Sequence, residues 1–161
     1  MSGNRRPPSL AARLLATTMY TGYFPFAPGT VGSLVATGLF LLAAPALPWW
    51  GLLIVLVGAT AAGFHSCAQV APAWGEDPSR VTVDEFAGCW LASIPGWLLF
   101  GTWGALAALV LFRVFDILKP WPVSALDRRG GPAAIMLDDL AAGVMAGGVL
   151  LLWSFVHGVF P

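Results

Sequence analysis

Acidic residues stand at three places along the chain where polar sequence meets a long apolar tract. They are the Asp84 and Glu85 pair, Asp116, and the Asp138 and Asp139 pair. Carboxylate oxygens are the ligands that Mg²⁺ prefers, and proteins commonly hold this ion with one or two carboxylates, waters and a substrate phosphate. If the fold brings the three places together, the sequence predicts a magnesium site.

These acids also have a structural interpretation. Asp and Glu at the start of a helix cap its free N–H groups and stabilise it by about 0.3–1 kcal/mol. Asp116 does not fit, because it stands near the predicted end of a helix, where the dipole disfavours an anion. Arg113 and Lys119 lie three residues before and after it. They either form a salt-bridge ladder with Asp116 along one helix face, or they meet an anion while the carboxylates hold a cation.

A glycine-rich turn, PGTVGS (28–33), is a candidate phosphate cradle. Gly29 lets the backbone approach a ligand, a helix beginning here offers free N–H groups, and Thr30 and Ser33 add hydroxyl donors. The chain has no Walker loop and no GxSxG elbow, so these well-known phosphate-binding and serine-hydrolase classes are excluded. His65 is either a structural histidine or a proton carrier for the site.

The composition is typical of a membrane protein. Only 10% of the 161 residues are charged, against about 25% in an ordinary soluble domain. Residues 14–75, 86–112 and 140–161 contain no Asp, Glu, Lys or Arg. A membrane-spanning helix needs about 20 apolar residues, so the tracts have room for several. The formal net charge is zero, which leaves no basic surface for a nucleic acid.

These tracts predict a single all-α membrane domain over residues 1–161, a polytopic helical bundle with about five membrane helices. Its predicted elements are a short N-terminal interfacial or re-entrant helix over 10–23, spans over 31–47 and 51–70, a helical hairpin over 86–112 that turns near 95–103, and a last span over 140–160. Asp138 and Asp139 would open that last span. Within it, Gly143 and Gly147 have the GxxxG spacing that permits close helix packing.

Charge distribution predicts the orientation. With a cytoplasmic N-terminus, all eight Lys and Arg residues fall on the inner side, as the positive-inside rule requires. All eight acids fall there too. We therefore expect a multi-pass protein of the bacterial cytoplasmic (inner) membrane with its site facing the cytoplasm.

Four sequence blocks resemble the phosphatidylglycerophosphatase A family of bacterial membrane enzymes. They are FPFAPGTVGSL (24–34), VTVDEFAGCW (81–90), FRVFDILKPWPV (112–123) and DRRGGPAAIMLDDLAAGV (127–144). The resemblance implies a Mg²⁺-dependent enzyme that removes the terminal phosphate of phosphatidylglycerophosphate to give phosphatidylglycerol.

The resemblance also implies roles for individual residues. The metal ligands would be drawn from Asp84, Glu85, Asp116, Asp138 and Asp139. The catalytic groups would be Asp84, Asp116, Lys119 and Asp139. The phosphate would contact Gly29, Thr30, Ser33, Arg113 and Lys119. Direct attack by water and an aspartyl-phosphate intermediate both remain open.

Two other functions are compatible with the residues alone. One is a phosphatase for a different lipid phosphate, such as phosphatidic acid. The other is a small ion-coupled transporter, which would place acids in mid-span, whereas the apolar tracts here are uninterrupted. The sequence carries no indication of a protein partner.

Overall fold

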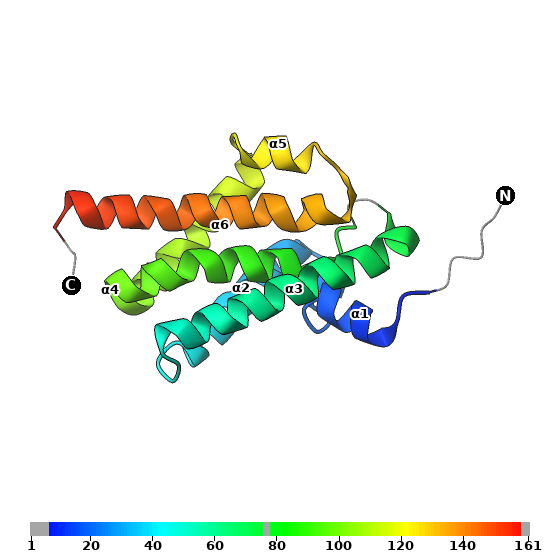
Figure 1. The fold of residues 1–161 in the computed structure, drawn as a ribbon, viewed down its shortest axis with the longest axis horizontal. Helices are drawn as coiled ribbons and strands as arrows, with labels where there is room; N and C mark the ends of the chain where they lie inside the picture. Colours follow the sequence, from blue (N-terminus) through cyan, green and yellow to red (C-terminus); the bar gives the residue numbers. More distant parts are fainter. Residues whose placement is uncertain (1–6, 76–77, 159–161) are drawn as a thin grey trace.

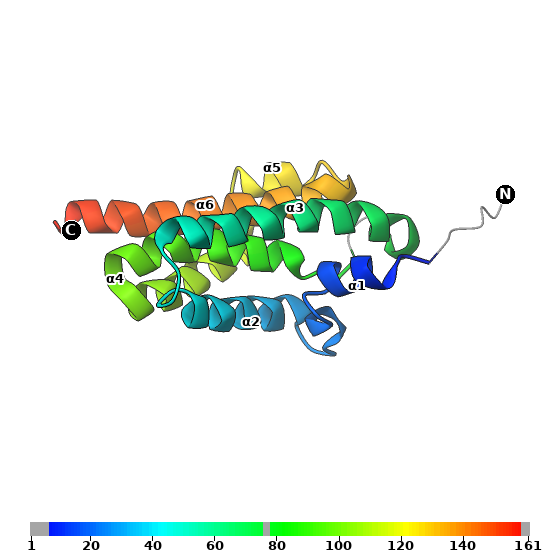
Figure 2. The same cartoon turned by 60° about the horizontal axis from the view of Figure 1, so that its bottom comes forward.

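The computed structural model describes residues 7–75 and 78–158, and within these ranges it is helical with no strand. Its elements are α1 (Leu10–Ala16), a 3₁₀ turn η1 (Thr21–Tyr23), α2 (Pro28–Ala43), α3 (Trp49–Trp74), α4 (Val83–Leu118), α5 (Val123–Asp127) and α6 (Gly131–Val156). In Figure 2, α2 lies on one side of α4, and α3 and α6 lie on the other. The all-α prediction is confirmed.

Helix α4 is a hairpin of two helical arms. Its backbone leaves the helical region at Gly101, where φ is 58° and ψ is −140°. A Cβ atom built on Gly96 would lie 2.5 Å from the carbonyl oxygen of Gly104, although eight residues of straight helix would separate these glycines by about 12 Å. Figure 1 shows the second arm returning beside the first. The predicted turn near 95–103 is therefore present, and only glycine readily adopts its positive φ.

Three helices, α3, α4 and α6, are long and apolar enough to cross a membrane, and α2 is a shorter apolar helix. Their outward faces carry large apolar side chains: Leu42 is 77% exposed and Val57 is 66% exposed. A water-soluble surface rarely exposes so much apolar area, whereas a lipid-facing surface requires it. The helices therefore have the character of a membrane bundle.

The starts of α4 and α6 lie at one end of this bundle, and the turn between the two arms of α4 and the C-terminal end of α6 lie at the other (Figure 1). Helix α2 begins beside Glu85 in the first turn of α4, because a Cβ on Gly29 would meet that side chain. The second arm of α4 returns to this end at Asp116. The fold thus gathers the polar helix ends that the sequence had separated.

Helices α4 and α6 approach closely through glycine. A Cβ on Gly88 would lie 2.5 Å from the carbonyl oxygen of Asp139, and one on Gly143 would collide with the carbonyl of Gly88. One turn further along, Gly147 packs against Pro95. The GxxxG spacing is therefore used as predicted, and it sets the distance between the acids at the start of α4 and those on α6.

This close approach predicts an asymmetric response to alanine. Gly143→Ala places a methyl group against the backbone of α4 and is expected to destabilise the protein by about 1–3 kcal/mol, as overpacking does. Gly148→Ala is the matched control, because a Cβ there has no neighbour within 4 Å, and it is expected to be neutral or slightly stabilising. Thermal unfolding in detergent measures both. Equal melting temperatures for the two variants would contradict the packing described here.

The N-terminal prediction of one helix over 10–23 is wrong in its length, because α1 ends at Ala16. The Thr17 hydroxyl donates to the carbonyl of Arg13 (2.8 Å) and accepts from the backbone N–H of Tyr20 (3.0 Å). Such side-chain bonds compete with the helical pattern. The residues that follow have positive φ: Thr18 (42°), Met19 (56°) and Tyr20 (72°).

The turn after α1 is attached to the start of α4. The backbone N–H of Thr82 donates to the carbonyl of Ala16 (2.8 Å), and the hydroxyls of Thr21 and Thr82 are 2.9 Å apart. Asp84 and Glu85 follow directly in the first turn of α4. The N-terminal segment thus helps to fix the position of this acidic pair.

Helix α6 begins earlier than predicted, at Gly131 rather than near residue 140. Pro132 stands in the first turn of α6. Proline is tolerated there because the N–H groups of the first turn have no acceptor within the helix, so the missing N–H removes no helical hydrogen bond. Asp138 and Asp139 therefore lie about two turns inside the helix instead of opening it. Helices α2 and α3 also begin before their predicted starts at 31 and 51, at Pro28 and Trp49. The predicted end at 160 lies outside the described residues.

Candidate active site

A polar cavity of about 380 Å³ opens among the start of α2, both ends of α4, and the start of α6. Every Asp and Glu within the described ranges lines it: Asp84, Glu85, Asp116, Asp127, Asp138 and Asp139. Arg113 and Lys119 line it as well. A concentration of charge at one end of an otherwise apolar bundle marks this cavity as the candidate functional site.

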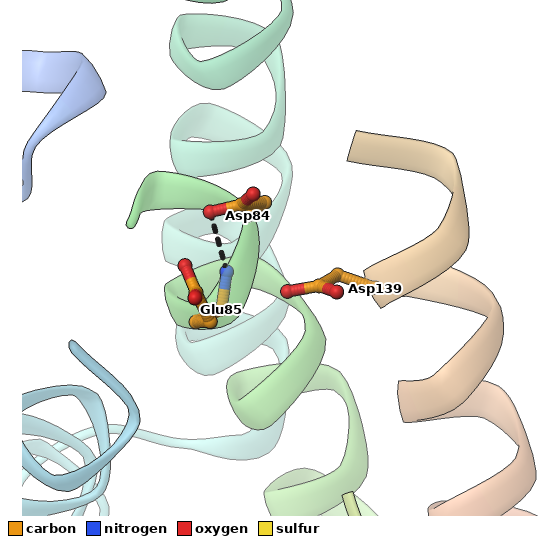
Figure 3. Close-up of side chains that lie close together, drawn as sticks. All are labelled: Asp84, Glu85 and Asp139. Carbon is orange, nitrogen blue, oxygen red and sulfur yellow. Dashed lines mark hydrogen bonds between the residues drawn. The ribbon is translucent and has the colours of Figure 1, made fainter. Parts of the chain in front are cut away.

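Three carboxylates form the centre of the cavity. Asp84 and Glu85 from the first turn of α4 and Asp139 from α6 each offer an oxygen, and these oxygens lie within 4.8 Å of one another. In Figure 3 the Asp139 carboxylate points from α6 toward the acidic pair. The backbone N–H of Glu85 donates to Asp84 Oδ1 at 3.0 Å, the bond drawn as a dashed line. We call these residues the carboxylate trio.

The trio leaves acceptor atoms unused. Glu85 Oε2 and Asp139 Oδ2 are buried and have no hydrogen-bond partner, and Asp138 Oδ1 nearby is in the same condition. Buried polar atoms normally have partners, and clustered carboxylates repel one another without a cation among them. A hard divalent cation with oxygen ligands fits this donor set.

Arg113 brings positive charge to the cavity beside the trio, since a Cβ on Gly29 would meet both Glu85 Oε1 and Arg113 Nη1. Its Nη1 donates to Asp116 Oδ2 at 2.6 Å, and its Nη2 donates to Thr30 Oγ1 on α2 at 3.4 Å. A Cβ on Gly29 would lie 3.4 Å from Nη1, so glycine allows α2 to pack closely against the guanidinium. Arg113 thus links the start of α2 to the second arm of α4.

Lys119 bridges two other acids. It is the C-cap of α4 with φ 43°, and Nζ donates to Asp127 and, at 2.9 Å, to Asp138 Oδ2. Burial lowers the pKa of the Lys119 ammonium, but the two carboxylate bonds outweigh it and hold that pKa above its usual range. Lys119 is therefore cationic at neutral pH.

The salt-bridge ladder considered from the sequence is present only in part. Arg113 pairs with Asp116, but Lys119 pairs with Asp127 and Asp138 instead. The reason is the left-handed backbone at Lys119, which ends the helix and removes its side chain from the face that Asp116 occupies.

Of the three residues expected to contact phosphate in the predicted phosphate cradle, only Gly29 lines the acidic cavity. Gly29 lines the cavity, and the N–H groups of the first helical turn have no acceptor within the helix. Thr30 contacts Arg113 but is not among the residues that line the acidic cavity. Ser33 is fully buried, and its hydroxyl donates to the carbonyl of Gly29 at 2.9 Å. In this arrangement Ser33 stabilises the first turn of α2 rather than facing the cavity.

Two cavity residues with polar side chains were not predicted as site residues, and one candidate lies elsewhere. Asp127 binds Lys119, and Ser79 lines the rim. Asp127 precedes two arginines in the DRRGG stretch, and this charged cluster could have indicated it as a site residue. No sequence pattern indicates that Ser79 lies at the site. His65 is exposed on α3, its Nε2 is 2.6 Å from Gln69 Nε2, and it does not line the cavity.

The fold and the site together define a helical, membrane-type protein with a carboxylate centre and two cations suited to phosphate. Residues 14–154 match the family model of phosphatidylglycerophosphatase A. The chain belongs to this family and is a lipid phosphatase.

Curated relatives agree with this assignment. The phosphatidylglycerophosphatases A of Escherichia coli and Haemophilus influenzae are 37% and 36% identical, over 85% and 83% of this chain and 80% and 82% of theirs. A Bacteroides thetaiotaomicron protein, provisionally named a phosphatidylinositol-3-phosphatase, is 40% identical over 85% of this chain and 89% of its own. No solved structure shows a significant match.

Proposed function

We propose that this protein hydrolyses the terminal phosphomonoester of phosphatidylglycerophosphate, giving phosphatidylglycerol and phosphate in phospholipid biosynthesis. The observation that carries the proposal is the carboxylate trio beside Arg113 in one cavity at the end of an apolar bundle. Two relatives carry the name of this activity and cover most of the chain.

We further propose Mg²⁺ as the cofactor, held by the trio of Asp84, Glu85 and Asp139. The two unpartnered buried oxygens of Glu85 and Asp139 support this choice. When bound, the ion polarises the phosphoryl group and stabilises the leaving oxygen. Asp116 and Asp138 are the other predicted ligands. Each accepts a hydrogen bond from a cation at Oδ2, and neither belongs to the group of close carboxylate oxygens, although Asp138 Oδ1 has no partner. We therefore assign them to positioning Arg113 and Lys119.

The remaining groups neutralise and orient the phosphate. Arg113 presents a planar set of N–H donors suited to two phosphoryl oxygens, and Lys119 adds a second positive charge. The backbone N–H groups at the start of α2 contribute further donors at Gly29. Direct hydrolysis and an aspartyl-phosphate both need a group that accepts a proton from water. Asp84 and Asp139 are our candidates, each through the carboxylate oxygen that does not hold the ion, and an aspartyl-phosphate would need an Asp as nucleophile as well.

For the topology, we propose five crossings: α2, α3, the two arms of α4, and α6. The described charged residues occur in or beside α1, both ends of α4, the α5 region and the first part of α6, and the Gly101 turn carries none. The positive-inside rule then directs the cavity to the cytoplasmic side of the inner membrane. Phosphatidylglycerophosphate could thus present its headgroup to the cavity while its chains stay in the inner leaflet.

Phosphatidylinositol 3-phosphate is a second candidate substrate, to be compared with phosphatidylglycerophosphate. The Bacteroides relative, 40% identical, is named for phosphatidylinositol 3-phosphate rather than for phosphatidylglycerophosphate. Both lipids are phosphomonoesters, so the same trio and cations would serve either one. Discrimination must come from contacts with the headgroup alcohol.

The test is phosphate release by purified protein in detergent micelles containing phosphatidylglycerophosphate, phosphatidic acid or phosphatidylinositol 3-phosphate. We expect kcat/KM for phosphatidylglycerophosphate to exceed the others by at least about 10-fold, a difference of ~1.4 kcal/mol in transition-state binding. We expect EDTA to abolish release and excess Mg²⁺ to restore it. Faster turnover of another lipid would overturn the substrate assignment alone, and full activity in EDTA would overturn the cofactor.

A further inference from the structure

An apolar groove of about 420 Å³ runs between the first half of α2 and the second arm of α4. Leu34 lines it from α2, and Val110, Val114 and Ile117 line it from α4. The three α4 residues are spaced i, i+4, i+7 and so lie on one face of the arm. They are 62%, 41% and 66% exposed, so they need an apolar covering.

This groove shares a lining residue with the acidic cavity, whereas the apolar grooves beside Leu53 and beside Val57 share none. Arg113 lines both spaces. Its Nη1 is bonded to Asp116 on the cavity side, and its Nη2 is bonded to Thr30, which lines the groove. The grooves beside Leu53 and beside Val57 have no charged residue in their lining.

We propose that this groove binds an acyl chain of the lipid whose phosphomonoester occupies the acidic cavity. The inference rests on the proposed function, because it requires a phosphomonoester lipid in that cavity. Such a lipid has a phosphomonoester at one end and apolar chains at the other, joined through a polar linkage that in phosphatidylglycerophosphate contains two glycerol units and a phosphodiester. The protein has a carboxylate-and-cation cavity and an apolar groove joined through Arg113. The order of polar and apolar parts is the same in the lipid and in the protein, with the Arg113 guanidinium between the phosphate and the linkage.

The groove also explains the position of Thr30, which the predicted phosphate cradle does not explain. Thr30 turns its hydroxyl to Arg113 at the border of the groove rather than into the cavity. There it orients the guanidinium between phosphate and linkage, at the point where the lipid passes from one space to the other. In this arrangement the second arm of α4 contacts the whole substrate. Arg113 and Lys119, toward the C-terminal end of the arm, contact the phosphate, and Val110 and Val114 contact the acyl chain.

The experiment fills the groove and compares two substrates. Val110→Trp places an indole in the groove; the matched control, Val57→Trp, places one in a comparable groove that does not border Arg113. The two valines are 62% and 66% exposed. We expect Val110→Trp to lower kcat/KM for dipalmitoyl phosphatidylglycerophosphate about 10-fold or more, and to change that for the dihexanoyl analogue less than twofold. Val57→Trp should leave both values unchanged.

A binding measurement separates this inference from the substrate assignment. A phosphatidic acid with a diazirine in its acyl chain, photolysed in vesicles with wild-type protein, should label peptides from α2 and the second arm of α4. Val110→Trp should remove that labelling. This result requires no turnover, so it stands even if phosphatidylglycerophosphate is not hydrolysed. Equal losses for both chain lengths, or equal labelling by a diazirine phosphatidylcholine without a phosphomonoester, would overturn the groove as a substrate site.

Discussion

Asp139→Asn is expected to lower phosphate release about 10³-fold while leaving the protein folded. The substitution keeps the shape of the side chain and removes its negative charge from the carboxylate trio. A bound divalent cation contributes several kcal/mol of transition-state stabilisation, and each 1.36 kcal/mol is a factor of ten in rate. Initial rates on phosphatidylglycerophosphate at saturating Mg²⁺ measure the loss. In wild-type protein, added Mg²⁺ should also raise the melting temperature, and Asp139→Asn should reduce that increase.

Asp127→Asn is the matched control, since it makes the same chemical change in the same cavity. Asp127 has a side chain 39% exposed and shares Lys119 with Asp138, so its loss leaves Lys119 paired. We expect a fall of less than about 10-fold, because exposed ion pairs contribute little. If Asp139→Asn retained wild-type activity and the full Mg²⁺-dependent rise in melting temperature, the assignment of the trio would be wrong.

Arg113→Met is expected to lower kcat/KM by about 10²–10³, the usual cost of removing one preorganised group that stabilises transition-state charge. Arg113 is positioned by Asp116 and Thr30, so its guanidinium needs little reorganisation when phosphate arrives. Arg113→Lys keeps the charge but loses the two-pronged donor geometry, and we expect it to recover only part of the activity.

Arg129→Met tests whether charge alone is responsible for the Arg113 effect. Arg129 is exposed and does not line the acidic cavity, so this change removes one positive charge from the same end of the bundle. We expect near wild-type kinetics. Equal losses in Arg113→Met and Arg129→Met would show a general electrostatic effect on membrane or substrate binding, and would remove Arg113 from the proposed phosphate contact.

Much of the fold could be predicted because membrane insertion imposes simple rules. Long tracts without charge must form helices, since lipid offers no partners for an unpaired backbone. The interruption near Gly101 therefore had to be a turn between helical arms, and the structure places it there. Helix limits were harder to predict. The start of α6 is an example. An absence of charge indicates which residues can contact lipid, but it does not indicate where a helix begins. Asp138 and Asp139 are charged and still helical, because they line a polar cavity.

The sequence by itself determined which residue types are available for chemistry and restricted them to the ends of apolar tracts. Only the tertiary structure decided their partners. Asp138 and Asp139 are adjacent, yet Asp138 pairs with Lys119 and Asp139 joins Asp84 and Glu85. Neighbouring residues on a helix point about 100° apart, so their environments depend on how α6 is rotated against α4. That rotation is fixed by the contact of Gly88 with Gly143 and the backbone of Asp139. The GxxxG pattern predicted a close helix contact at Gly143, but no local pattern names the helix that packs there.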